Sequence, residues 1–348
     1  MNARIAAVVM LSATFALEAA PRTVAIEVPL GEEGLISASA IDDRGRGWIA
    51  VATPEPWRTD FYRIGPDGAT RDARIAGSIV KSIRQLAGRE RYFIHEARSH
   101  ANGGASAFFR VVEAHGGKLT TLWDSDRLPA NVRTDEFLVT VSDDARQWAS
   151  ASITDHEVRV TFGTTAATKP RTTVSVASEP VPLPDGFEYD GAGLEFIQRA
   201  GDKPLVAALW RGRIFIIDGE RVVARLVPPN GASSLAFDST SSTLWALSSR
   251  SAAAFDVRDV TKPAKVTILS GDHGRATEVS PLDGARLAMT MIDRGVLVSD
   301  VEDGNGNRVR KSFNRSGTHG RLVVSRGGNA ILEQPDASRS RTVFLHLN

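Results

Sequence analysis

The sequence predicts an all-β protein, a seven-bladed β-propeller built from four-stranded antiparallel blades. Three observations predict this fold class. A unit of about 44 residues recurs along the chain, each unit reads as short strands separated by polar turns, and one extra strand precedes the first unit. Seven units fit the chain, beginning near Gly34, Ser78, Thr134, Gly191, Gly231, Arg275 and His319.

The first unit shows the pattern that the others repeat. Residues 35–41 alternate with small side chains, and residues 42–47 are Asp, Arg and Gly, which is typical of a turn. Residues 48–52 and 61–64 read as apolar strands, and residues 71–75 as a more polar fourth strand. Polarity therefore rises from the first strand to the last, as expected when the first strands face the centre of a ring.

Later units keep this order of strand, turn and strand. In the third unit, residues 137–141 and 148–153 flank an Asp-Asp turn, and in the fifth, residues 234–238, 243–247 and 254–257 are apolar. Short strands with aromatic residues at this spacing favour radial repetition over a β-sandwich.

The two ends of the chain predict how the ring closes. The last unit shows only three strands, near residues 322–325, 330–333 and 342–347, whereas residues 23–28 form a predicted strand without a unit. We expect this N-terminal strand to pair into the last blade, because that pairing removes two open sheet edges.

The N-terminal residues predict export. Arg4 precedes a 13-residue apolar stretch at positions 5–17, and the small residues Ala19 and Ala20 follow. Such a segment is typical of a secretory signal peptide and is shorter than the ~20 residues that cross a bilayer as a helix. We therefore expect a signal peptide at 1–20, a single domain at 21–348, no membrane span, and a periplasmic or secreted protein.

Composition narrows the class further. Arginine outnumbers lysine by 35 to 7, which suggests a GC-rich bacterial genome, and the absence of cysteine excludes disulfides. The net charge of +1 argues against a dedicated nucleic-acid surface, and no long linker divides the chain. We expect a monomeric domain that binds no nucleic acid.

One pattern resembles a known class of propellers. His273 and His319 each precede Gly-Arg at equivalent positions, and in the sixth unit Thr290 and Asp293 follow at the positions of a strand and a tight turn. This order resembles the WD-repeat pattern, although Ser299 stands at the Trp position. The chain is thus similar to the broad WD-like and YVTN-like class, which implies structural roles for His273, Thr290, Asp293 and His319 and no particular activity.

Ionisable residues gather in two neighbouring units, in what we predict to be second-to-third-strand loops of the binding face. These candidates for ligand binding are His95, Glu96, Arg98 and His100 in the second unit, and His156 and Glu157 in the third. Imidazoles and carboxylates suit a transition metal or acid-base chemistry. The alternative is that they are separate solvated side chains, since the chain has no short metal-ligand motif. We predict no cofactor, with calcium or zinc as the alternative.

Two aromatic-cationic pairs are further candidates in the same set of loops. Trp57-Arg58 and Trp210-Arg211 place an indole beside a guanidinium, a combination that stacks on a sugar or a peptide side chain. Packing against a neighbouring blade is the competing interpretation of these residues.

The fold permits several functions, and the sequence has no nucleophile elbow, Walker loop or dinucleotide-binding loop. The leading hypothesis is a recognition module for a protein, peptide or glycan. The first alternative is a hydrolase or lyase of the propeller lactonase or esterase type, with a metal in the central channel. A structural component of an envelope assembly is the second alternative.

Overall fold

The structure is a computed structural model. It describes residues 22–86, 90–101, 103–115, 118–129, 132, 137–154, 157–167, 169–177, 192–197, 205–228, 232–247, 251–260, 264–270, 276–284, 286–293, 296–302, 308–314, 320–335 and 341–347. The predicted signal peptide lies outside this part of the chain.

The described strands form seven four-stranded antiparallel sheets. We number the sheets in chain order from the one that begins with β2, and the first strand of sheets 1 to 7 is β2, β6, β10, β14, β18, β22 and β26. Sheets 1 to 3 consist of β2 (Leu35–Ile41), β3 (Gly47–Pro54), β4 (Trp57–Gly65) and β5 (Gly68–Ala76); β6 (Ser78–Gln85), β7 (Arg91–Ser99), β8 (Ala105–His115) and β9 (Lys118–Asp124); and β10 (Phe137–Val141), β11 (Gln147–Ile153), β12 (Glu157–Thr164) and β13 (Thr172–Ala177).

Sheets 4 to 7 continue the order. They consist of β14 (Gly193–Ile197), β15 (Leu205–Trp210), β16 (Arg213–Ile217) and β17 (Val222–Leu226); β18 (Ser234–Asp238), β19 (Thr243–Leu247), β20 (Ser251–Asp256) and β21 (Ala264–Ser270); β22 (Ala276–Leu282), β23 (Arg286–Asp293), β24 (Val296–Glu302) and β25 (Arg308–Asn314); and β26 (Arg321–Val324), β27 (Ala330–Gln334) and β28 (Thr342–Leu347) with β1 (Arg22–Glu27).

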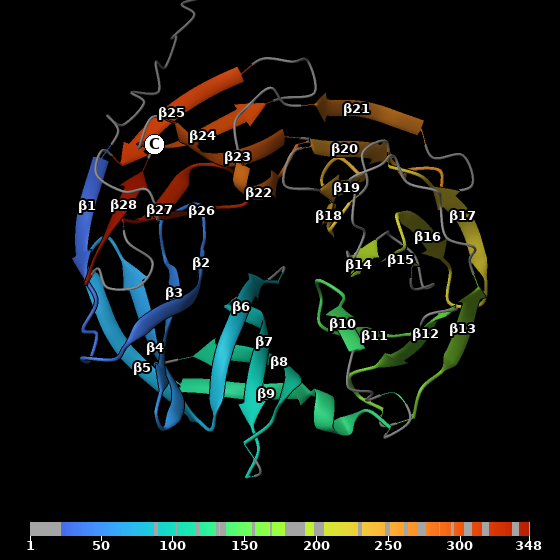
Figure 1. The fold of residues 1–348 in the computed structure, drawn as a ribbon, viewed down its shortest axis with the longest axis horizontal. Helices are drawn as coiled ribbons and strands as arrows, with labels where there is room; N and C mark the ends of the chain where they lie inside the picture. Colours follow the sequence, from blue (N-terminus) through green and yellow to red (C-terminus); the bar gives the residue numbers. More distant parts are fainter. Residues whose placement is uncertain are drawn as a thin grey trace, which may run out of the picture.

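The predicted all-β class is confirmed, and the sheets have a propeller-like arrangement. The described helical structure is a single 3-10 turn at Ser125–Arg127. The sheets follow one another around a ring, with the first strand of each sheet toward the centre and the last toward the outside (Figure 1). Among the described residues, no helix has the length and apolar character that a membrane span requires.

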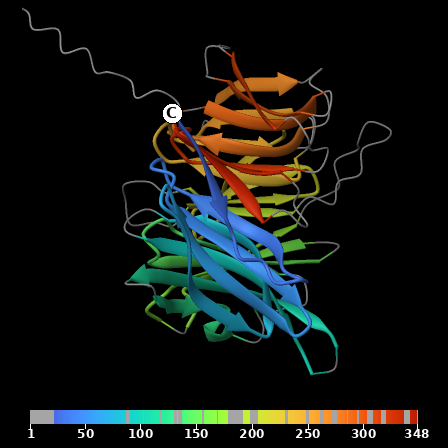
Figure 2. The same cartoon turned by 90° about the vertical axis from the view of Figure 1, so that its left-hand side faces the viewer.

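The N-terminal strand lies in the same sheet as the last three strands. β1 pairs antiparallel with β28, from Arg22 opposite Leu347 to Glu27 opposite Thr342. The blue N-terminal strand and the red C-terminal strands therefore lie side by side (Figure 2). The pairing buries Ile26, which is 1% exposed, in a core shared with sheet 1.

Neighbouring sheets are held together by apolar cores. The indoles of Trp123 in sheet 2 and Trp148 in sheet 3 stack with 6.4 Å between ring centroids, and both are buried. Similar clusters join sheets 1 and 2, sheets 3 and 4, and sheets 4 and 5. Burial of apolar area stabilises such contacts by roughly 25 cal/mol per Å², so the described sheets depend on their neighbours for stability.

The turns from first to second strand share one design in sheets 1, 3 and 7. In each, the side chain of the first turn residue accepts a hydrogen bond from a backbone N–H near the turn's end. The pairs are Asp42 with Arg46 at 2.9 Å, Ser142 with Gln147 at 3.0 Å and Ser325 with Ala330 at 2.9 Å. These hydrogen bonds fix the backbone of each turn. They therefore also fix the direction in which the side chain of the second turn residue leaves the backbone.

Candidate functional site

A cavity of about 530 Å³ lies where the first strands of the seven sheets end. Its lining includes residues from the first strand, or from the turn that follows it, of every sheet. The charged lining side chains among the described residues are Asp42, Asp43, Arg84, Asp143, Glu195, Asp238, Asp283 and Arg326. Apolar walls come from side chains that include Leu86, Leu235, Phe237, Leu282 and Val323. We call this space the central cavity.

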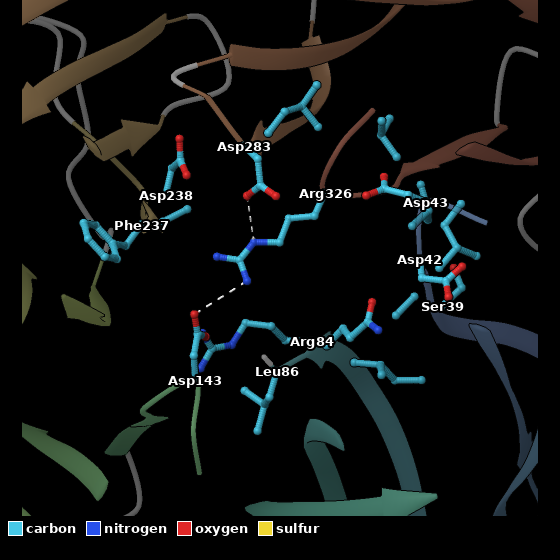
Figure 3. A pocket seen from close by; sticks show the side chains of 18 of the residues that line it. Ser39, Asp42, Asp43, Arg84, Leu86, Asp143, Phe237, Asp238, Asp283 and Arg326 are labelled. Atoms are coloured by element: carbon cyan, nitrogen blue, oxygen red, sulfur yellow. Dashed lines mark ion pairs between the residues drawn. The ribbon is translucent and has the colours of Figure 1, made fainter. Parts of the chain in front are cut away.

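Ion pairs cross the central cavity and connect five sheets. Arg84 of sheet 2 has its Nη1 atom 3.2 Å from Glu195 Oε1 of sheet 4 and 3.7 Å from Asp143 Oδ1 of sheet 3. Arg326 of sheet 7 reaches the same Asp143 at 3.6 Å and Asp283 of sheet 6 at 3.1 Å (Figure 3). The chain of charges therefore runs from Asp283 through Arg326, Asp143 and Arg84 to Glu195.

The two arginines are held differently. Arg84 Nη2 donates to the backbone carbonyl of Val141 at 2.9 Å, and its guanidinium lies 5.6 Å from the centroid of the Phe93 ring. Arg326 makes ion pairs with Asp283 and Asp143, and its Nη2 atom donates a 3.5 Å hydrogen bond to the Ser239 hydroxyl. Arg84 is thus anchored by the backbone of a neighbouring sheet, whereas Arg326 is held by side chains.

Asp143 and Arg326 enter this chain of charges from the same position, the second residue, of their turns. Asp43, Asp143 and Arg326 each follow the capping residue of their turn, and each contacts the preceding sheet of the ring. Asp43 accepts hydrogen bonds from the Ser325 hydroxyl at 2.7 Å and from the Gly327 N–H at 2.8 Å. One turn position therefore links successive sheets beside the central cavity.

Burial shifts the pKa of two carboxyl groups in the cavity. Burial raises the pKa of Glu195, and the charge of Arg84 opposes this shift. Burial also raises the pKa of Asp283. The charge of Arg326 opposes this shift, and the nearby charges of Asp238 and Asp43 add to it. Carboxyl groups with a raised pKa in a cavity are frequent at functional sites.

The predicted loop site of the second unit is wrong in its secondary structure. His95, Glu96 and Arg98 lie inside strand β7 (Arg91–Ser99), not in a loop. Successive side chains of a strand point to opposite faces. His95 accordingly stacks on Phe109 at 4.6 Å between centroids, on the side toward sheet 3, whereas Glu96 lies on the other face of β7. The two side chains therefore do not converge on one ligand.

Glu96 is part of a buried ion pair. Its side chain is 0% exposed and contacts the Arg110 guanidinium, with an Arg110 Nη2 to Glu96 Oε2 distance of 2.8 Å. Arg98 stacks over the Phe108 ring at 3.4 Å and pairs with Asp126 at 3.0 Å. These contacts are between side chains of sheet 2 and the 3-10 turn after it, as expected of a structural cluster.

The remaining loop candidates occupy separate places. His100 is exposed in the turn after β7, and Glu157 begins β12 and pairs with Arg159 at 2.6 Å. His156 lies outside the described residues, so a shared ligand for His95 and His156 stays a prediction. Among the described residues, no group of three or more His, Asp or Glu side chains has the geometry of a metal site.

The aromatic-cationic pairs differ from each other. Trp57 and Arg58 begin strand β4 and are half-buried, and Arg58 lies 3.7 Å from Asp60. Trp210 is 4% exposed in the core between sheets 3 and 4, with the Arg211 guanidinium 5.2 Å from its ring centroid. The packing interpretation therefore fits Trp210.

The predicted structural histidines His273 and His319 lie outside the described residues, as do the side chains of Thr290 and Asp293. Their roles stay a prediction.

The residues of the central cavity were not among the predicted site residues. Asp42, Asp43 and Asp143 were predicted only as turn residues, and the predicted binding face was at the opposite ends of the strands. A usable signal was present, because the second turn position carries a charge in the first, third and seventh units, as Asp43, Asp143 and Arg326.

Comparisons with known proteins show the fold. No family model matches the chain, and no curated protein matches its sequence. The chain is similar to the crystal structure of Sqt1 from Chaetomium thermophilum, a WD40 β-propeller protein, with a TM-score of 0.55 and 15% sequence identity. The alignment covers 91% of this chain and 97% of Sqt1. The chain therefore has a WD-like propeller fold.

Proposed function

We propose that this protein is a recognition module that binds a protein or peptide at the central cavity. In this proposal the seven sheets are the blades of a seven-bladed β-propeller that β1 closes into a ring. The protein acts in the periplasm or outside the cell after loss of a signal peptide at 1–20. The last two statements rest on the sequence patterns at the two ends of the chain.

The observation that carries the proposal is the ionic chain across an apolar-walled cavity. Binding sites are concave, mostly apolar, and carry a few polar groups that fix orientation. Here the apolar wall includes Phe237 and Leu282, and the polar groups include Asp143 and Arg84. These groups come from different sheets, so their spacing is set by the ring and is already in place before a partner binds.

A panel of fluorescent peptides of varied charge tests this proposal. We expect saturable one-to-one binding of at least one peptide, weakened at least tenfold by Asp143→Asn, because loss of one member of a desolvated charge pair costs about 2–5 kcal/mol. Asp67→Asn is the matched control, since Asp67 is exposed in the β4–β5 turn outside the cavity. Melting curves verify that both variants are folded.

Binding that is unaffected by Asp143→Asn would place the site elsewhere and contradict the proposal.

The second candidate function is a hydrolase or lyase, favoured by the raised pKa of Glu195, which suits acid-base chemistry. Turnover of an ester or lactone panel that is abolished by Glu195→Gln, without saturable peptide binding, would establish the enzyme instead.

A further inference from the structure

The Arg326 side chain lies in the central cavity, and its contacts are weak enough for another cationic side chain to replace it. Its guanidinium makes single contacts of 3.1 Å to Asp283, 3.6 Å to Asp143 and 3.5 Å to Ser239. The side chain is 38% exposed. A guanidinium can instead bind a carboxylate through two parallel hydrogen bonds, which is the stronger arrangement. We call the position between Asp283 and Asp143 the seat. The contacts that Arg326 makes there are therefore weaker than those that a guanidinium paired with a carboxylate through two hydrogen bonds would make.

The side chain of Arg326 can leave the seat without disturbing the backbone. Its turn is held by the Ser325 side chain at Ala330 N–H and by Asp43 at Gly327 N–H, and neither bond involves the guanidinium. Asp143 keeps its second ion pair, with Arg84, when Arg326 moves. Rotation of the half-buried Arg326 side chain therefore breaks none of the hydrogen bonds that hold its turn.

The surroundings of the seat favour a cation even with Arg326 in place. The described lining has six carboxylates and two guanidiniums. Burial raises the pKa of Asp283, the charge of Arg326 opposes this shift, and the nearby negative charges of Asp238 and Asp43 add to it. Phe237, Leu235 and Leu282 supply an apolar wall beside the carboxylates, which suits the methylene stem of a long cationic side chain.

We propose that the seat between Asp283 and Asp143 binds a cationic side chain of the partner, arginine in preference to lysine, and that Arg326 is its intramolecular stand-in. Arginine is preferred because the present occupant is a guanidinium and because its fork matches carboxylates. This inference rests on the proposed function. It adds the chemistry of the partner and an internal competitor that lowers the apparent affinity by the fraction of seats that Arg326 fills.

The test uses blocked pentapeptides Gly-Gly-X-Gly-Gly, with X as arginine, lysine, citrulline or glutamate, titrated against the full chain. Citrulline keeps the shape of arginine and removes its charge. We expect the arginine peptide to bind at least tenfold more tightly than the citrulline peptide. Arg326→Gln should tighten arginine-peptide binding at least threefold, and Asp283→Asn should weaken it at least tenfold. Arg44→Gln, in an exposed turn outside the central cavity, should change nothing.

The sign of the Arg326→Gln effect decides the inference. Weaker or unchanged binding of the arginine peptide would overturn it, and so would a glutamate peptide that binds the unmodified protein and loses affinity in the variant. If Arg326→Gln does not fold, Arg326→Lys replaces it, with tighter arginine-peptide binding expected and weaker or unchanged binding overturning the inference. Asp143-dependent binding of uncharged panel peptides, without preference for arginine over citrulline, would overturn this inference and leave the recognition function standing.

Discussion

The Asp43 carboxylate accepts a hydrogen bond at 2.7 Å from the Ser325 hydroxyl, 282 residues further along the chain. The same carboxylate accepts the Gly327 N–H at 2.8 Å, so the first turn of sheet 1 is bonded to the corresponding turn of sheet 7. In sheet 3, Ser142 instead donates to Asp144 of its own turn at 2.6 Å. Sheet 7 has glycine at that position, and the carboxylate comes from the neighbouring sheet.

Gly327→Ala should weaken this contact between sheets 7 and 1. A Cβ at residue 327 would lie 2.5 Å from Asp43 Oδ2, so the carboxylate must move away from both of its donors. Hydrogen bonds to charged groups contribute about 1.5–3 kcal/mol each, and we expect a loss of that order in urea unfolding. Gly31→Ala is the control, since a Cβ there meets nothing within 4 Å. Equal stability of the two variants would contradict the prediction.

Ile26→Ala should destabilise the whole domain, although Ile26 belongs to the N-terminal strand. The side chain is 1% exposed and packs in a core with residues that include Val343 and Leu345 of β28. Truncation of a buried isoleucine costs about 2–5 kcal/mol. Ala25→Ser, on the exposed face of β1, should have little effect. The measurement is the free energy of unfolding, and a loss under about 1 kcal/mol would show that β1 contributes little to the core.

Arg110→Leu should be among the most destabilising single changes in sheet 2. It leaves the Glu96 carboxylate, which is 0% exposed, without its guanidinium. Removing one member of a buried pair costs about 3–5 kcal/mol, whereas replacing both members is often neutral. We therefore expect the double variant Glu96→Leu, Arg110→Leu to recover most of the lost stability. A double variant that is no more stable than Arg110→Leu alone would contradict this explanation.

His95→Phe should make the protein less sensitive to mild acid. Burial, together with the charge of Lys81, lowers the pKa of His95 below its usual value of 6.5. The stability that this histidine contributes is therefore present above pH 6.5 and is lost as the pH falls through the lowered pKa. Phenylalanine keeps the stacking on Phe109 and cannot be protonated. The measurement is the free energy of unfolding of both proteins at pH 7.5 and at pH 5. We expect the stability of the variant relative to the parent to be greater at pH 5 than at pH 7.5.

Parallel loss of stability in the parent and in His95→Phe would show that the imidazole is not desolvated in the folded protein. The change at residue 95 leaves every carboxyl group in place. The acid titration of those groups therefore affects both proteins alike and cancels in the comparison.

The strand pattern was predictable because it is local. Alternation and turn residues placed the first strands of the units near Gly34, Ser78 and Thr134, and those strands begin at Leu35, Ser78 and Phe137. The strand without a unit at residues 23–28 was likewise visible, and it is β1. A run of charged residues was less informative. His95 to Arg98 looked like a loop, because buried ion pairs and stacking allow polar residues inside a strand.

The sequence by itself determined the all-β class, the turns and the strand that pairs with β28, since each follows from residues close together in the chain. Only the tertiary structure decided which charges meet in the central cavity. Arg84, Asp143, Asp283 and Arg326 stand tens to hundreds of residues apart and come together because the ring brings the first strands of different sheets to one axis. The direction of each side chain at that axis depends on strand register and turn geometry. A shift of the register by one residue would turn the side chains to the other face of the sheet.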